Sequence, residues 1–339
     1  MRTRVLGRCA VVLGAAFVLV SCGGSGGGTG GEGTGQVVLY TSEPQENADA
    51  LIAGFNEDHP DIEVQVVRNG TGNLLARIES ERQAGGVQGD VMVAADATSF
   101  EGLKQDDVFQ TYEPEGSENI EDRFKDPEGY YTGTRLISTV IGYNTNEVDD
   151  PPESWAELTG EEYRGMIGMP SPDYSGAAAY NTAVWADNPD LGWSWIEGVV
   201  ANEPSVVEGN GEVQQGIATG QYPVGIIIDY MMRDIQEQGS PVDYVFPQEG
   251  VPAIYQPAAI FRDAQDVESA QTFVDWLISD AGQELAVEQS YVPIRSDVAG
   301  PENAPALDEI EVMEGDVLEL SEQLDPARER FNGLLNQGG

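Results

Sequence analysis

The spacing of hydrophobic and polar residues along the chain predicts strands and helices in alternation. Residues 37–40 form an apolar run typical of a buried strand, and apolar residues then recur at helical spacing from 48 to 55. Residues 62–66 alternate as a strand does, 74–78 follow a helical pattern, and 91–95 form another apolar run. This order favours a mainly parallel sheet covered by helices, with ligand-facing loops where the strands end.

A segment rich in Gly, Pro and acidic residues, 113–129, interrupts this order. The apolar strand predicted at 136–143 is long enough to cross from one lobe to another, and 253–261 has the pattern of a return crossing. Between the crossings the alternation restarts, with strands at 166–169 and 222–228 and with helices after 175, at 193–200, at 212–219 and from 229. The final helices, which carry Phe273 and Trp276 on one face, are expected to pack back on the first lobe.

These segments predict an α/β fold of two lobes, with two crossing strands as the hinge and a ligand cleft between the lobes. We expect residues 36–136 and 261–339 to form lobe 1 and residues 137–260 to form lobe 2. At the start of the first helix, Ser42 is placed to cap and Gln45 completes a capping box.

The N-terminus has the pattern of an export signal. A basic start is followed by an apolar run at 10–20, and Ser21 and Cys22 then give way to glycines. This pattern resembles a bacterial lipoprotein signal peptide, which implies removal of residues 1–21, lipid attachment at Cys22 and a Gly-rich tether over 22–35. The protein would then be extracytoplasmic and anchored to the membrane. A short transmembrane anchor is the alternative, although the apolar run is too short to cross a bilayer as a helix.

The chain is strongly acidic, with 59 Asp and Glu against 16 Lys and Arg and a net charge of −43. Loss of three signal-peptide arginines would change −43 to −46. Such a surface repels nucleic acid and anionic lipid head groups, so neither is an expected partner. The carboxylates are spread from Glu43 to Glu329, which indicates a solvated shell rather than a ligand site. Cys9 and Cys22 precede the folded part, which excludes disulfides and Cys–zinc sites from it.

Four segments together carry a family resemblance: 38–42 entering a helix, 164–170, 220–226 and 273–283. In order and spacing they resemble the solute-binding proteins of ABC importers, in the cluster of ferric-iron and 2-aminoethylphosphonate or phosphate-ester binding proteins. The resemblance implies a type II periplasmic-binding-protein-like fold. It also implies a monomer without a cofactor or enzymatic activity, which closes over a small molecule or ion and delivers it to a permease with its ATPase subunit.

Two helix starts are candidate anion sites. Ser175, Gly176 and Ala177 open a helix just after Tyr174, so that free amides, a hydroxyl and the positive helix end converge there. The family uses the matching position for phosphate, phosphonate or a synergistic anion. Helix capping alone would also explain Ser175. The same two readings apply to the other helix start, which has the candidates Thr41 and Ser42.

Further candidates follow predicted strands or precede the crossing. Asn69, Thr71 and Asp96 can donate or accept hydrogen bonds, although ordinary turns explain them equally well. Arg135 has the planar fork that binds an oxyanion through two hydrogen bonds, and its alternative is a salt bridge. Tyr230 follows the strand predicted at 222–228, and buried packing competes with ligand binding there.

Ferric iron is the main alternative ligand. Ferric-binding relatives carry adjacent tyrosines after the strand that matches 222–228, whereas this chain has only Tyr230 between Asp229 and Met231. If iron is bound, Tyr230 and Tyr174 are the candidate metal ligands. A polyamine or sugar receptor and a secreted hydrolase are weaker alternatives. His59 is the single histidine and the folded part has no thiol, so the chain has almost none of the residues that a hydrolytic triad needs.

Overall fold

A computed structural model of the chain describes residues 35–95, 97–313 and 315–337. The predicted signal peptide and nearly all of the tether, with Cys22, lie outside these residues, as does Asp96. The described residues belong to one compact unit. Within them, no helix combines the length and the apolar character needed to cross a membrane.

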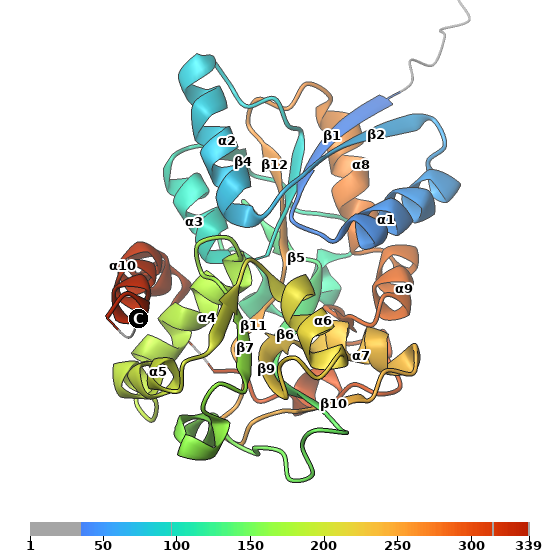
Figure 1. Ribbon diagram of the computed structural model, residues 1–339. Helices are drawn as coiled ribbons and strands as arrows, with labels where there is room; N and C mark the ends of the chain where they lie inside the picture. The colour runs from blue at the N-terminus through green and yellow to red at the C-terminus, as the bar shows by residue number, and fades with distance from the viewer. Residues whose placement is uncertain (1–34, 96, 314, 338–339) are drawn as a thin grey trace, which may run out of the picture. The chain divides into compact units, whose positions relative to one another are not determined.

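The first sheet has the strand order β2-β1-β3-β12-β4, with β5 also paired to β12 (Figure 1). β1 runs parallel to β2 and β3, whereas β12 is antiparallel to β3, β4 and β5. The predicted mainly parallel sheet is therefore mixed. Its strands are β1 (Gly35–Thr41), β2 (Ile62–Arg68), β3 (Val91–Val93), β4 (Phe109–Gln110), β5 (Thr132–Gly133) and β12 (Pro257–Phe261).

Helices cover both faces of the first sheet. Successive residues of a strand point to opposite faces. Val37 and Leu39 therefore pack with Phe55 and Phe273 on one face, whereas Tyr40 packs on the other. The helices are α1 (Gln45–Asp58) and α8 (Val267–Leu277) on the first face, and α2 (Thr71–Ala84) and α3 (Ala97–Gln105) on the second.

The second sheet has the strand order β10-β6-β9-β7-β8, with β11 and β13 also paired to β6. Its strands are β6 (Arg135–Asn144), β7 (Ile167–Pro170), β8 (Ser205–Val207), β9 (Val224–Ile228), β10 (Val242–Val245), β11 (Ala253–Ile254) and β13 (Val292–Pro293). The accompanying helices are α4 (Gly176–Asp187), α5 (Gly192–Ala201), α6 (Asn210–Ala218) and α7 (Asp229–Glu237). The core around this sheet includes three contacting tryptophans, Trp155, Trp185 and Trp195.

The chain changes sheet at two adjacent points. β5 and β6 are separated by Thr134, and β11 and β12 by Tyr255 and Gln256. The predicted single strand 253–261 is thus two short strands, because Gln256 has a positive φ of 30° that breaks the extended conformation. The Thr134 amide donates to the Tyr255 and Gln256 carbonyls at 3.1 Å each, and its hydroxyl donates to the Gln256 carbonyl at 2.7 Å.

The C-terminal part of the chain contacts elements of both sheets. It contains α9 (Asp280–Glu288) and α10 (Val317–Leu335) in addition to α8 and β13. β13 pairs with β6 of the second sheet, and α10 packs on both α3 and α4 (Figure 1). The division of the chain into lobes at 136 and 261 stays a prediction.

Short 3₁₀ helices occur in the connections, at Ser117–Asn119, Asp122–Phe124, Ala156–Thr159, Glu161–Tyr163 and Leu307–Glu309. The predicted cap of the first helix is wrong: α1 has Pro44 as its N-cap residue, with no capping side chain, because Pro44 itself keeps an extended conformation. Ser42 is therefore free for another role.

Candidate ligand-binding site

A cavity of about 360 Å³ is lined by loops that follow strands of the first sheet and by loops that follow strands of the second sheet. Five helices, α1, α2, α4, α6 and α7, begin at this cavity. Their N-cap residues all line it: Pro44, Gly70, Ser175, Gly209 and Ile228. The connectivity produces this convergence, because helices that follow the carboxyl ends of strands start at the same edge of a sheet.

Four of these five helix starts have no capping side chain. The exception is α4, where the Ser175 hydroxyl accepts a hydrogen bond of 3.3 Å from the Ala178 amide. The first amides of a helix have no partner within the helix, and the helix dipole places partial positive charge at the same end. The cavity is therefore electrostatically suited to an anion.

Among the described residues that line the cavity, Arg68 is the only Lys or Arg. It ends β2, is exposed, and its Nε donates to the backbone carbonyl of Glu43. Arg68 is not among the sequence-predicted site residues, although its position at the end of a strand, just before Asn69, is typical of a ligand-facing residue. A guanidinium at this edge can bind an oxyanion through its remaining N–H groups.

Arg135 lies behind the cavity wall rather than in it. Its side chain is buried over the ring of Tyr291, 4.3 Å from the ring centroid, and donates to Gln289 at 3.2 Å. It also forms an ion pair of 3.8 Å with Glu43. Arg135 is thus occupied by protein groups in this conformation, and a role in ligand binding stays a prediction.

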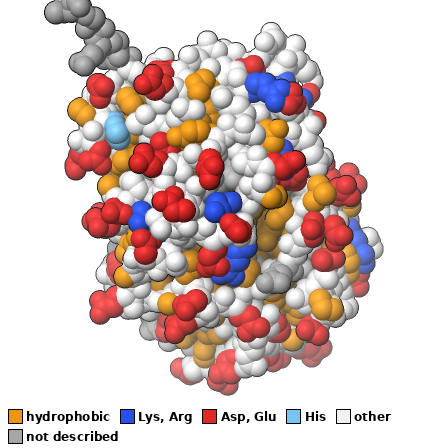
Figure 2. Space-filling view, turned by 180° about the vertical axis from the view of Figure 1, so that it is seen from behind, with side chains coloured by type: hydrophobic (Ala, Val, Ile, Leu, Met, Phe, Trp, Pro, Cys, Tyr) orange, Lys and Arg blue, Asp and Glu red, His pale blue; other side chains and the backbone are white. Residues whose placement is uncertain are grey.

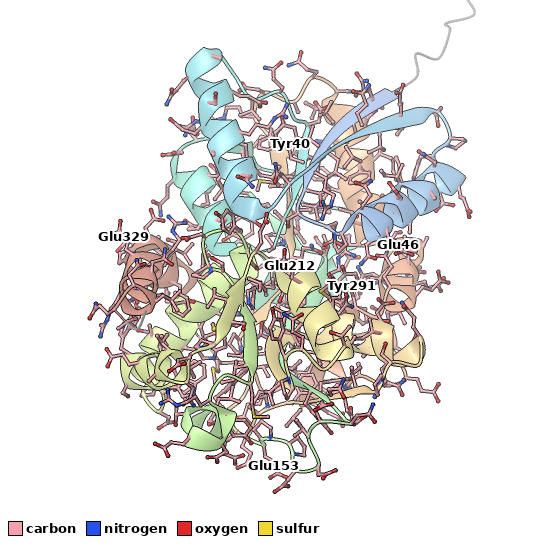
Figure 3. All side chains as sticks on the ribbon, in the orientation of Figure 1. Tyr40, Glu46, Glu153, Glu212, Tyr291 and Glu329 are labelled. Atoms are coloured by element: carbon pink, nitrogen blue, oxygen red, sulfur yellow. The ribbon has the colours of Figure 1, made fainter. Side chains whose placement is uncertain are left out.

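Glu43 connects a group of buried polar side chains at the cavity floor. Its carboxylate accepts hydrogen bonds from the Tyr291 hydroxyl at 2.7 Å and from the Gln256 amide. The rings of Tyr230 and Tyr291 lie 4.1 Å apart between centroids. Burial, and next the charge of Glu43, raise the pKa of both phenols well above the usual range, so both are neutral at neutral pH. Tyr291 lies in the middle of the folded part (Figure 3).

The structure brings most of the sequence-predicted site residues to this one cavity. Those that line it are Ser42, Asn69, Thr71, Tyr174, Ser175, Gly176, Ala177 and Tyr230. Thr41 is not among the lining residues; it is buried, and its hydroxyl accepts from the Glu43 amide at 3.1 Å. Contact of any of these residues with a ligand stays a prediction.

Two glycines at the start of α2 closely approach the loop before α4. A Cβ atom built on Gly70 would lie 2.7 Å from the Tyr174 carbonyl oxygen, and one on Gly72 would lie 3.2 Å from that of Asp173. The first distance is too short for any Cβ atom. The described conformation therefore requires glycine at position 70.

Residues 89–314 match the family model described as bacterial extracellular solute-binding protein. The chain belongs to this family. It is 23% identical over 269 residues to an uncharacterized protein of Haemophilus influenzae, covering 75% of this chain and 76% of that one. It is 24% identical over 248 residues to a probable ABC transporter periplasmic-binding protein, y4fP, of Sinorhizobium fredii, covering 68% of this chain and 67% of that one.

Solved structures show the same fold. Iron-bound HitA from Pseudomonas aeruginosa superposes with a TM-score of 0.78 at 19% identity, covering 88% of this chain and 99% of that one. AfuA from Actinobacillus pleuropneumoniae, solved with fructose-6-phosphate, also has a TM-score of 0.78, at 22% identity, covering 89% and 97%. The predicted two-lobed type II periplasmic-binding-protein-like fold and the resemblance to solute-binding proteins are confirmed. The family is one of binding proteins and not of enzymes.

Proposed function

We propose that this protein is the extracytoplasmic receptor of an ABC importer and that it captures a small oxyanion, an organophosphonate or a phosphate ester. The observation that carries the ligand assignment is the convergence of five helix N-termini on one cavity. Each such terminus favours a negative charge by about 0.3–1 kcal/mol, and by up to about 2 kcal/mol in partly buried geometry. Together with Arg68 they offer an anion several hydrogen-bond donors and partial positive charges.

The acidic surface of the protein does not contradict this proposal. Acidic side chains are spread over the face shown in Figure 2 rather than gathered in one patch. Their fields are screened over about 8 Å at physiological salt, whereas the helix termini and Arg68 act at contact distance. The family relationship to y4fP and the shared fold with sugar-phosphate-bound AfuA support both the transport role and the ligand class.

In the proposed cycle, the lobes close over the ligand by bending at the two crossings, near Thr134 and Gln256. The closed protein then presents the ligand to the permease, whose ATPase subunit drives import. Closure excludes water and lets both sides of the cleft contribute contacts. We further propose that Cys22 carries the lipid that holds this receptor, as a monomer, at the membrane.

Ferric iron is the second candidate, because the structure places Tyr291 beside Tyr230. Two phenols and the Glu43 carboxylate would offer hard oxygen donors, and HitA, which shares the fold, is iron-bound. Two observations make this reading weaker. Both phenols are protonated in the metal-free protein, so iron would have to displace their protons, and Glu43 is occupied by Tyr291, Gln256 and Arg135.

Thermal-shift screening tests the proposal. The panel contains 2-aminoethylphosphonate, simple phosphate esters and chelated ferric iron. A ligand at 100 times its Kd stabilises the folded state by about 2.7 kcal/mol, so the melting temperature should rise visibly with at least one oxyanion. Stabilisation by iron alone, with a visible charge-transfer colour that Tyr230→Phe abolishes, would contradict the oxyanion assignment.

A further inference from the structure

Two polar atoms in the cavity wall are buried without a hydrogen-bond partner. They are the hydroxyl oxygen of Thr71 and the side-chain amide oxygen of Gln256. Both residues line the cavity, and each is only 2% exposed. Buried polar atoms in native proteins are nearly always paired, so two unpartnered atoms on residues that line the cavity call for a partner.

The orientation of the Gln256 amide follows from its neighbour. Its nitrogen donates to the Glu43 carboxylate, which in turn accepts from the Tyr291 hydroxyl. A carboxylate only accepts hydrogen bonds, so the amide nitrogen must face Glu43, and the amide oxygen is left without a partner. The backbone of Gln256 is also held, because its carbonyl accepts from both the amide and the hydroxyl of Thr134.

The two unpartnered atoms need different chemical groups. The Thr71 hydroxyl, at the first residue of α2, can donate to an oxyanion. The Gln256 amide oxygen can only accept, so an oxygen of a fully ionised phosphate or phosphonate cannot satisfy it. Glu43 and Glu208 also line the cavity and likewise accept rather than donate. The cavity therefore provides acceptors as well as an anion-binding wall.

We infer that the ligand carries a hydrogen-bond donor, a hydroxyl or an ammonium group, in addition to its oxyanion, and that the Gln256 amide oxygen accepts from this donor. The inference rests on the proposed function and narrows its ligand class. The size of the cavity agrees: about 360 Å³ falls within the range of about 300–1,000 Å³ of small-molecule sites, and a water molecule takes about 30 Å³. Gln256 is then a specificity-determining residue, placed at the second crossing.

Matched pairs of probes test the inference on the full chain by calorimetric titration. The first pair is 2-aminoethylphosphonate and ethylphosphonate, and the second is glycerol 3-phosphate and propyl phosphate. Within at least one pair, the member with the donor should bind tighter by roughly tenfold or more, as expected when a buried acceptor is otherwise left unpaired. The pair that shows the preference tells an ammonium from a hydroxyl.

Three variants assign the preference to its residue. Gln256→Met keeps the shape and removes the acceptor, and should reduce the preference to about one. Gln256→Glu keeps an acceptor and should retain the preference, while the lost bond to Glu43 and the added negative charge should weaken binding of both members of each pair. Gln289→Met is the control. It removes the same type of side chain from the hydrogen bond with Arg135, outside the cavity lining, and should also retain the preference for the donor.

The possible outcomes distinguish failure of this inference from failure of the proposed function. Equal binding within both pairs by the wild-type protein overturns this inference and leaves the oxyanion proposal standing. A donor preference that persists in Gln256→Met also overturns it, because another residue then accepts from the donor. If the wild-type protein binds none of the four probes, the proposed function fails and this inference fails with it. Should Gln256→Met not fold, the wild-type comparison and Gln256→Glu still decide.

Discussion

At the scale of single residues, the close approach of two loops beside the cavity depends on an absent side chain. Gly70 belongs to the first-sheet side, and the Tyr174 carbonyl that it approaches belongs to the loop before α4. That loop is itself held, because Asn332 of α10 donates to the Asp173 carboxylate at 2.9 Å. The loop therefore has little freedom to move away from a larger residue at position 70.

Gly70→Ala should weaken ligand binding by roughly tenfold or more, equivalent to about 1.4 kcal/mol, because the added Cβ opposes the close approach of the two loops that line the cavity. Gly102→Ala is the control: it lies within α3, and no atom lies within 4 Å of the added Cβ. Titration of both variants with the best ligand of the screen checks this. Equal affinities would show that the close approach at Gly70 is not needed for binding.

The sequence predicts many of the residues that line the cavity, but it does not predict the hydrogen bonds around Glu43. Ser42, Asn69 and Ser175 follow from strand ends and helix starts, which local patterns reveal. Gln256 and Tyr291 do not, because they meet Glu43 from positions more than 200 residues away. No local signal connects such residues, and only the fold brings them together.

At the scale of elements, the long apolar strands and amphipathic helices were predictable, whereas short edge strands were not. β4 and β8 have two and three residues, too few for a period to be recognised. The return crossing was predicted as one strand because all its side chains except Gln256 are apolar. The interruption at Gln256 arises from bonds to Thr134, which lies on the other crossing.

Helix α2 is joined to β1 by a polar contact with a measurable pH dependence. The Tyr40 hydroxyl donates to both oxygens of Glu81 at 2.8 and 2.9 Å, and Arg77 donates to both residues. Burial, and next the hydrogen bond to Glu81, raise the pKa of Tyr40 to about 12. A raised folded-state pKa gives stability that is complete below pH 10 and is lost as the pH rises from 10 to about 12.

Tyr40→Phe should lower the free energy of unfolding at pH 7 by roughly 1–2 kcal/mol, through loss of the bond to a charged group. It should also reduce the further loss of stability between pH 10 and 12. Urea unfolding at several pH values measures both effects, with Tyr174→Phe as a half-exposed control. An alkaline loss identical to that of the wild-type protein would contradict the assignment to Tyr40.

At the scale of the whole molecule, charge is the dominant property. The full chain has a net charge of −43, and acidic residues are dispersed over the face shown in Figure 2. Self-repulsion of this kind destabilises the compact state and is relieved by salt. The Debye length falls from about 30 Å at 0.01 M to about 3 Å at 1 M, so most of the repulsion is removed over this range.

The melting temperature should therefore rise between 0.01 M and 1 M NaCl. The exposed ion pairs oppose this rise only weakly, since each contributes about 0–1 kcal/mol. Potassium chloride at the same ionic strengths serves as the control for specific sodium effects. A falling melting temperature would mean that attractive pairs outweigh the repulsion.

The central claim is that the helix starts and Arg68 bind an oxyanion, and calorimetric titration of the ligand-free protein tests it most directly. At least one phosphonate or phosphate ester should bind with a Kd of about 1 µM or tighter, equivalent to about −8.2 kcal/mol. Arg68→Met should weaken this binding by roughly tenfold or more, while the unliganded protein still unfolds cooperatively after losing the bond from Arg68 to the Glu43 carbonyl. Absence of binding by every oxyanion, or unchanged affinity in Arg68→Met, would contradict the account.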